Sequence, residues 1–196
     1  MILAFTLIIG GAMVVMACLW AWQQYRQDAG IVDVGWAYCL GGAAVILAWL
    51  GDGQPGRRWL LALLAGCWSL RLGTYLLRHR ILRPGVHEDG RYQRLRQAMG
   101  TRAGVGFLLF FQFQAWLVPL FALPYWVVAR NSLPLSWLDA AGVVVGLLAI
   151  VGETLADRQL ARFRSEPTNR GHTCQTGLWR YSRHPNYFFE WLQWFA

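Results

Sequence analysis

The stretch that decides the fold is residues 1–25, MILAFTLIIGGAMVVMACLWAWQQY, in which no side chain carries a charge. It ends in Trp20, Trp22 and Tyr25, and these residue types favour the boundary between membrane and water. A helix needs about 20 apolar residues to cross the hydrocarbon core of a bilayer, so this run is long enough for one span. A cleaved signal peptide has a positively charged start and a small-residue cleavage site, and neither is evident here. We therefore expect this helix to remain in the mature protein.

Similar apolar runs recur along the chain. We expect further spans over residues 34–51, 59–77, 103–129 and about 138–156, and a sixth apolar stretch that begins at Tyr187. The composition agrees, because 56% of the residues are apolar and only 14% are charged, against roughly a quarter in soluble domains. The sequence predicts an all-α bundle of about six transmembrane helices, which form one membrane-embedded domain over residues 1–196.

The basic residues are distributed unevenly. All 18 are arginines; residues 78–103 hold seven of them and residues 157–184 hold six. Short cytoplasmic loops concentrate basic residues, so both regions belong in the cytoplasm and the N-terminus lies outside. Arg57 and Arg58 fall on the predicted outer side and are the exception. A net charge of +8 is compatible with nucleic acid, but nucleic-acid binding does not need long uncharged runs, so we exclude that partner. The exclusive use of arginine suits a GC-rich genome, and we expect a multi-pass protein of a bacterial inner membrane.

The four cysteines, Cys18, Cys39, Cys67 and Cys174, have neither CxxC spacing nor paired histidines around them. The sequence therefore predicts no disulfide framework and no metal site.

Polar and charged groups within the predicted spans are costly to bury and so indicate pairing or function. Arg71 and Tyr75 lie one turn apart on the third span, although an ion pair with a neighbouring helix explains Arg71 equally well. Asp33 opens the second span, where an aspartate is either a helix N-cap or a functional carboxylate. Glu153 and Asp157 are spaced so that both carboxylates share one face of the fifth span.

The most informative stretch is residues 177–190, GLWRYSRHPNYFFE, where the chain re-enters the membrane. Its proline suits the first turn of a helix, which puts Asn186 and Glu190 one turn apart on a single face. Arg183 and His184 then lie at the helix N-terminus, where an anion is favoured. Arginine and tryptophan by themselves are typical of interfacial anchoring. Because Asn186 and Glu190 extend the polarity into the bilayer, we favour a functional site.

At these positions the sequence resembles the steroid 5α-reductase family in the broad sense. These multi-span NADPH-dependent reductases are similar to sterol C14 and C7 reductases and, more distantly, to isoprenylcysteine carboxyl methyltransferases. The resemblance extends over much of the chain and rests on Asp33-x2-Trp36, Arg71-x3-Tyr75, Glu88-Asp89-x-Arg91-Tyr92, Glu153-x3-Asp157-x-Gln159 with Arg164, and YSRHPNY over residues 181–187 with Glu190.

The resemblance implies that NADPH reduces a conjugated C=C bond of a hydrophobic, lipid- or steroid-like substrate in the membrane, at a cofactor site that faces the cytoplasm. Asp33 and Tyr75 are the candidates for proton donor or carbonyl partner. The implied cofactor contacts are Arg71, Asp157, Arg164, Arg183, His184, Asn186, Tyr187 and Glu190. The first arginine-rich loop is expected to hold phosphates or adenosine. A glycine is usual where Phe189 stands, and the family continues beyond the last helix, so we expect a C-terminal segment that this chain lacks.

Two other functions remain open. The Arg-His-Pro-Asn-Tyr core is shared in variant form with the methyltransferases, which favours S-adenosylmethionine-dependent methylation of a lipid or prenylated thiol as the first alternative. The second is a non-enzymatic membrane protein whose arginine loops bind anionic lipid headgroups. Asp157, Asn186 and Glu190 favour the reductase.

Overall fold

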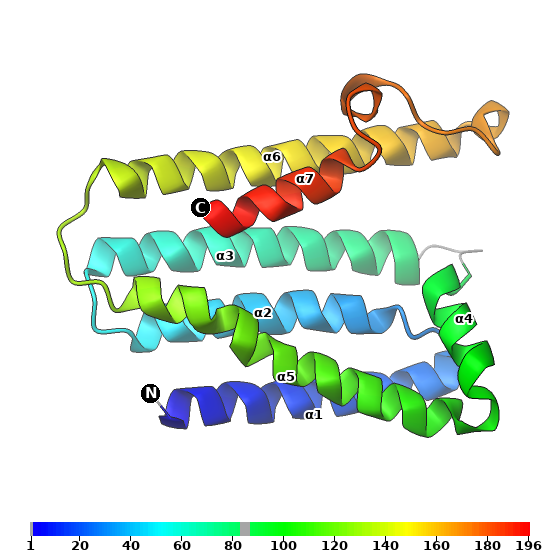
Figure 1. Cartoon of the computed structure of the whole chain (residues 1–196), viewed down its shortest axis with the longest axis horizontal. Helices are drawn as coiled ribbons and strands as arrows, with labels where there is room; N and C mark the ends of the chain where they lie inside the picture. The colour runs from blue at the N-terminus through cyan, green and yellow to red at the C-terminus, as the bar shows by residue number, and fades with distance from the viewer. Residues whose placement is uncertain (1, 83–86) are drawn as a thin grey trace. The chain divides into compact units, whose positions relative to one another are not determined.

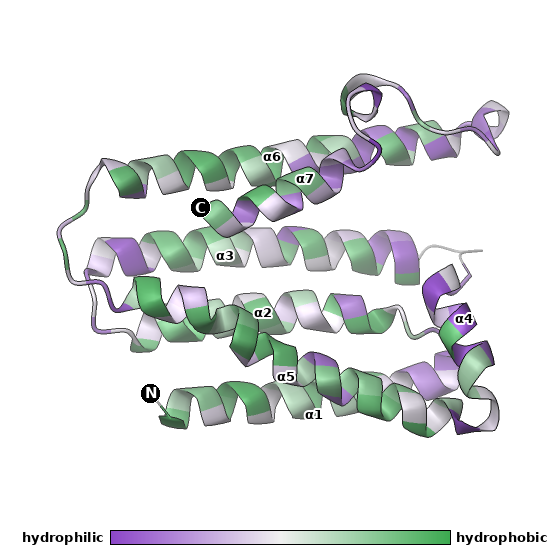
Figure 2. Ribbon diagram, in the orientation of Figure 1, coloured by the Kyte–Doolittle hydropathy of each residue, from purple (hydrophilic) through white to green (hydrophobic). Residues whose placement is uncertain are grey.

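The computed structural model describes residues 2–82 and 87–196, and within these ranges the chain is helical and has no strand (Figure 1). The α-helices are α1 (Ile2–Arg26), α2 (Ile31–Leu50), α3 (Pro55–Leu76), α4 (Gly90–Met99), α5 (Ala103–Ala129), α6 (Trp137–Ser165) and α7 (Pro185–Leu192). Among the described residues, five helical stretches are long and apolar enough to cross a membrane: Ile2–Arg26, Ile31–Leu50, Pro55–Ile81, Gly90–Ala129 and Trp137–Ser165. Figure 2 shows that these helices are mostly hydrophobic and that α4 is more hydrophilic. The prediction of an all-α, multi-pass membrane protein is confirmed.

The predicted sixth span differs from the structure. The residues around Tyr187 form α7, which has eight residues and is followed by the short 3-10 helix Gln193–Phe195. At 1.5 Å per residue, α7 is about 12 Å long, against a hydrocarbon core of about 30 Å. The described residues of this region therefore do not span a bilayer by themselves.

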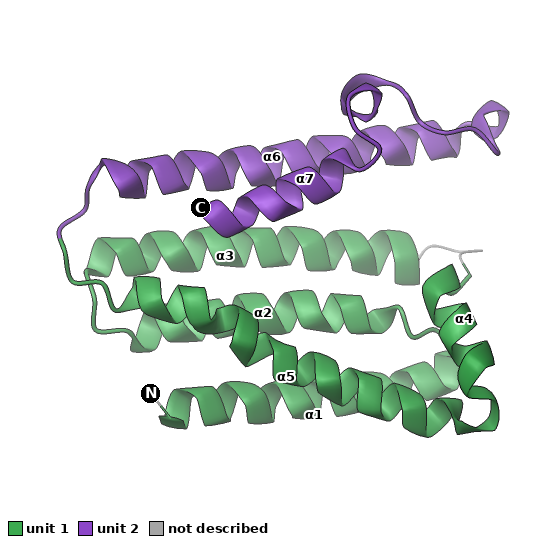
Figure 3. Ribbon diagram, in the orientation of Figure 1, with its two compact units in different colours: residues 1–133 green, residues 134–196 purple. Residues whose placement is uncertain are grey.

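The chain divides into two compact units, residues 1–133 (unit 1) and 134–196 (unit 2), which are coloured separately in Figure 3. Unit 1 contains α1 to α5, and unit 2 contains α6 and α7. The expectation of a single domain over residues 1–196 stays a prediction.

Helix α2 is the centre of unit 1 and packs against α1, α3 and α5. Its close approach to α3 depends on small residues. The Ser69 side chain occupies the space of a missing Cβ at Gly41, and its hydroxyl donates a hydrogen bond to the carbonyl of Ala37 at 2.9 Å. The ring of Tyr38 lies on Gly73 in the same way. Such small-residue contacts are typical of helices that pack in membranes.

The two arginines on the predicted outer side have structural partners. Arg57 is buried and donates through Nη1 to the carbonyls of Asn131 (2.9 Å) and Leu133 (3.0 Å), which follow α5. Arg58 donates through Nε to the carbonyl of Ala48 (2.7 Å) in the last turn of α2. Arg58 satisfies a carbonyl that the end of α2 leaves without an intrahelical donor, and Arg57 ties the start of α3 to the loop that follows α5. These roles explain why they depart from the positive-inside distribution.

In unit 2 the chain returns along α6 after the second arginine-rich region. The ring of Phe189 on α7 occupies the space of a missing Cβ at Gly152 on α6. The family that this sequence resembles usually has a glycine at the position of Phe189. In this chain the glycine of this contact is Gly152, on the facing helix α6. Trp179 also donates through Nε1 to the carbonyl of Ala156 at 2.9 Å. These contacts hold α7 and the segment before it against the second half of α6.

Candidate functional site

Two predicted site residues, Asp157 and Asn186, contact each other inside unit 2. Asp157 lies on α6 with only 3% of its surface exposed, and it accepts a hydrogen bond from Nδ2 of Asn186 on α7 at 3.3 Å. The amide oxygen of Asn186 is buried, and no hydrogen bond to it occurs among the described residues. A buried acceptor without a donor is costly, so this oxygen is suited to a donor that the described residues do not supply.

Two further acids surround this pair. Glu153 precedes Asp157 by one turn and is buried on the same face of α6, as predicted. Glu190 follows Asn186 by one turn on α7 and is half-buried. The polar face of α7 therefore continues beyond Asn186, as the sequence predicted.

A basic groove of about 690 Å³ lies at the end of α6 and along the segment that follows it. It contains three arginines, Arg164, Arg170 and Arg183, together with His172, against one acid, Glu166. Its volume falls within the range of roughly 300–1,000 Å³ that is usual for small-molecule sites. The groove therefore suits an anionic ligand.

The groove and the Asp157–Asn186 pair share one side of α6. Leu160, which lines the groove, follows Asp157 by three residues, and Arg164 follows it by seven. Seven residues are close to two turns, so Arg164 projects from the same face as Asp157, about 10 Å further along the helix. One face of α6 thus carries both Asp157, which holds the amide of Asn186, and Arg164 of the groove.

His184 and Tyr187 are exposed at the start of α7 and do not line this groove. Their rings stack, with centroids 5.2 Å apart and an angle of 15° between the planes. His184 is the N-cap residue of α7, but its side chain makes no capping hydrogen bond. These two predicted cofactor contacts therefore do not line the groove, although Arg183, which does, directly precedes His184.

The predicted catalytic residue Asp33 lies in unit 1, within the first turn of α2. Its interpretation as a helix N-cap is wrong, because Gly30 is the N-cap and no side chain caps this helix. Instead, Asp33 accepts hydrogen bonds from the hydroxyl of Tyr92 at 2.7 Å and from Nη2 of Arg91 at 3.2 Å. Nη1 of Arg80 lies 3.6 Å away. Asp33 is therefore the acceptor that joins α2 to α4.

Neighbouring carboxylates also engage the first arginine-rich loop. Partial burial raises the pKa of Asp89, but hydrogen bonds from the side chain and backbone of Arg91 lower it more, so the net shift is downward. Glu88 pairs with Arg96 at 2.7 Å. Carboxylates of the chain thus pair with Arg91 and Arg96, and the expectation that this loop holds phosphates stays a prediction. Arg83 lies outside the described residues.

Arg71 and Tyr75 form a stack on α3. The guanidinium carbon of Arg71 lies 5.5 Å from the centroid of the Tyr75 ring, which stacks on His79 with centroids 4.4 Å apart. His79 was not predicted, although its spacing from Tyr75 is the same four residues that separate Arg71 and Tyr75. It belongs to a π-helical turn, Leu77–Ile81, that continues α3. Such turns occur frequently at functional sites.

Sequence reasoning did not single out several residues that the structure brings into these clusters. Arg170 and His172 join the groove, and Arg80 and Tyr92 reach Asp33. Tyr92 could have been found from its place in the Glu88-Asp89-x-Arg91-Tyr92 motif. The groove could have been predicted from the high number of arginines after residue 157.

Residues 19–196 match a family described as "Protein of unknown function (DUF1295)". The chain belongs to this family. DUF1295 is a steroid 5α-reductase-like membrane family, which confirms the resemblance at that level. No curated protein and no solved structure matches the chain.

Proposed function

We propose that this DUF1295 protein is a membrane reductase that uses NADPH to reduce a conjugated C=C bond in a hydrophobic substrate. We place it in a bacterial inner membrane, with the cofactor site facing the cytoplasm. The observation that carries the proposal is the amide of Asn186, whose nitrogen is held by Asp157 and whose buried oxygen has no donor among the described residues.

The geometry of Asn186 suits a nicotinamide. Because Nδ2 donates to Asp157, the amide oxygen points away from that carboxylate and is available as an acceptor. The carboxamide of a nicotinamide carries an NH2 group that donates to such an oxygen. Asp157 therefore acts as a positioning residue, since it sets which side of the Asn186 amide is presented.

The basic groove suits the phosphates of a dinucleotide. Guanidinium groups bind phosphate oxygens in bidentate fashion, and Arg164, Arg170 and Arg183 supply three of them. S-Adenosylmethionine has no phosphate, so its binding does not require three arginines in one groove. The donor set consequently favours NADPH over S-adenosylmethionine.

When bound, NADPH supplies a hydride, and the protein contributes binding, orientation and the exclusion of water. Polarising the substrate carbonyl requires a proton or hydrogen-bond donor. Of the two candidates in unit 1, Tyr75 carries an O–H group, whereas Asp33 already accepts from Tyr92 and Arg91. We therefore assign the donor role to Tyr75 and a positioning role for α4 to Asp33.

The proposal is tested by isothermal titration of the full chain in detergent with NADPH and, separately, with S-adenosylmethionine. We expect NADPH to bind and S-adenosylmethionine to give no response. Asn186→Leu removes one buried hydrogen bond of about 1–1.5 kcal/mol, so the dissociation constant of NADPH should rise about tenfold. Gln114→Leu on α5, which also removes an amide from a transmembrane helix, is the matched control and should leave the constant unchanged.

Other outcomes favour other functions. Binding of S-adenosylmethionine without NADPH identifies a methyltransferase. Failure to bind either cofactor, together with retention on anionic vesicles, supports a lipid-binding membrane protein. Unchanged NADPH affinity in Asn186→Leu means that the dinucleotide binds elsewhere.

A further inference from the structure

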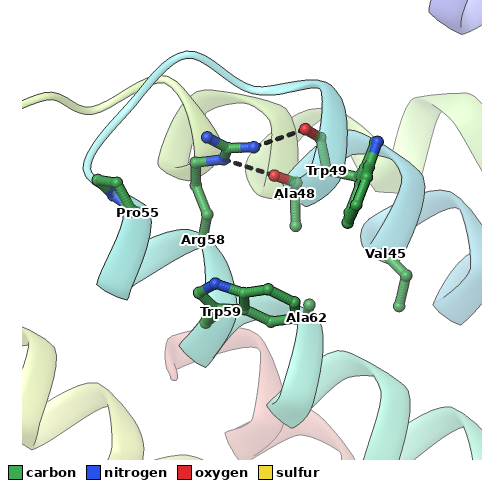
Figure 4. A pocket seen from close by; sticks show the side chains of 7 residues that line it. All are labelled: Val45, Ala48, Trp49, Pro55, Arg58, Trp59 and Ala62. Atoms are coloured by element: carbon green, nitrogen blue, oxygen red, sulfur yellow. Dashed lines mark hydrogen bonds between the residues drawn. The ribbon is translucent and has the colours of Figure 1, made fainter.

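Unit 1 contains a groove that the proposed reductase activity does not use. It has a volume of about 390 Å³ and lies between the last turns of α2 and the first turns of α3. Its lining consists of Val45, Ala48, Trp49, Pro55, Arg58, Trp59 and Ala62 (Figure 4). Six of these seven residues are apolar or aromatic, so the groove offers an apolar channel with a single charged group.

That charged group is Arg58, which is half-buried and only partly engaged by the protein. Nε donates to the carbonyl of Ala48 at 2.7 Å, and Nη2 donates to the carbonyl of Trp49. No hydrogen bond among the described residues uses Nη1, and Figure 4 shows the third guanidinium nitrogen turned away from both carbonyls. Two backbone carbonyls thus hold Arg58, and Nη1 remains as a donor for an anion.

No carboxylate hydrogen-bonds to Arg58 among the described residues. Asp52, in the loop between α2 and α3, pairs with Arg130 through Nε at 3.2 Å. Hydrogen bonds from its own backbone and from Arg130 lower the pKa of this exposed carboxyl. The positive charge of Arg58 also lowers this pKa, but no hydrogen bond joins Asp52 to Arg58, so Nη1 of Arg58 remains available to a ligand.

The groove lies at a membrane boundary. It is at the end of α3 opposite the first arginine-rich loop, on the side predicted to be outside. Trp49 and Trp59 flank it with 72% and 62% of their surfaces exposed. Tryptophan rings at a helix end mark the headgroup level of a bilayer. A ligand that reaches this groove from the membrane brings an acyl chain to the apolar walls and a headgroup to Arg58.

We infer that this groove binds an anionic phospholipid of the outer leaflet. Its phosphate accepts hydrogen bonds from Nη1 of Arg58, and one acyl chain lies between Val45 and Ala62. A zwitterionic lipid carries a cationic group next to its phosphate, so the site selects lipids with net negative charge. The site is independent of the Asp157–Asn186 pair and of the cofactor.

The test is lipid binding by the full chain, purified in detergent and measured by native mass spectrometry. The probes are palmitoyl-oleoyl phosphatidylglycerol and phosphatidylcholine with the same chains. We expect phosphatidylglycerol to bind at least about fivefold more tightly than phosphatidylcholine. Arg58→Gln removes a charge-assisted hydrogen bond and should weaken phosphatidylglycerol binding about tenfold. Arg102→Gln replaces an exposed arginine of the first arginine-rich loop, at the other end of unit 1; it is the charge-matched control and should have no effect.

Arg58→Gln also removes two hydrogen bonds to α2, so a second variant keeps the test decisive. Ala62→Phe fills the apolar channel and leaves every contact of Arg58 in place. It should weaken phosphatidylglycerol binding about tenfold without lowering the unfolding temperature. Unchanged binding in Ala62→Phe, equal affinity for both lipids, or an equal loss in Arg102→Gln overturns the inference. Complete displacement of the lipid by excess inorganic phosphate also overturns it, because it identifies a phosphate site.

Discussion

Replacing Glu88 by alanine should destabilise the end of unit 1 that carries the first arginine-rich loop. Glu88 joins three parts of the chain. Its carboxylate accepts two hydrogen bonds from Arg96 on α4, at 2.7 and 3.1 Å, and a third from the backbone amide of Ala29 at 2.8 Å. Ala29 is fully buried between α1 and α2. In Glu88→Ala its backbone amide therefore loses this acceptor and has no water to replace it.

The magnitude follows from burial. The side chains are 8% exposed for Glu88 and 22% exposed for Arg96, so water screens the pair only weakly. Removing one partner of a buried ion pair costs about 3–5 kcal/mol. Arg96 keeps hydrogen bonds to the side-chain oxygens of Gln23 and Gln27, so we expect the lower end, about 3 kcal/mol. For a chain of this size, the unfolding temperature should fall by about 6–12 °C.

Thermal unfolding of the purified protein in detergent measures this effect. The control is Glu166→Ala, which removes an exposed carboxylate that accepts a hydrogen bond from Nδ2 of Asn169 at 3.3 Å. It should shift the midpoint by about 1–2 °C. In the double variant Glu88→Ala with Arg96→Met no uncompensated charge remains, so part of the loss should be recovered. A shift for Glu88→Ala no larger than that of the control would refute the reasoning.

Two further predictions concern the packing of unit 2. Gly177→Ala should cost about 2–3 kcal/mol, because φ is +59° and the new Cβ would lie 2.5 Å from Oε1 of Gln159, which binds the next backbone amide. Gly171→Ala, at φ +84° in open space, isolates the backbone strain and should cost only about 1–2 kcal/mol in the same unfolding assay. Gly152→Ala should displace the ring of Phe189, cost about 1–3 kcal/mol and weaken NADPH binding. Adding Phe189→Ala should restore the helix contact, and no recovery of the unfolding temperature would contradict the assigned packing.

The membrane spans were largely predictable, because hydropathy depends on residues that are neighbours in the chain. Helix α5 begins at Ala103 and ends at Ala129, as predicted, and continues through both of its prolines. Helix α6 extends to Ser165, nine residues beyond the predicted end at 156. Its last turns carry exposed arginines, which fit the surface of a helix as well as a loop. Hydropathy marks where lipid ends and does not mark where the helix ends.

The candidate site was predictable where its chemistry conflicted with its surroundings. Asp157 and Asn186 stood out as polar groups in apolar runs, and they meet in the structure. Asp33 also stood out as a charged group beside an apolar run, but the sequence did not reveal its partners Tyr92 and Arg91. Tyr92 follows it by 59 residues, and pairing at that separation depends on how α4 lies against α2. The sequence assigned a role to each residue and could not choose its partner.

The sequence alone determined that this chain is an α-helical membrane protein, where its arginine-rich regions lie and which polar residues need an explanation. The tertiary structure decided which arginines carboxylates already neutralise and which remain in an open groove. It also decided that no residue in the described part of the chain donates to the amide oxygen of Asn186. The physical reason is that insertion into lipid depends on local composition summed along the chain. Hydrogen bonds and ion pairs instead act over a few ångströms between residues that only helix packing brings together.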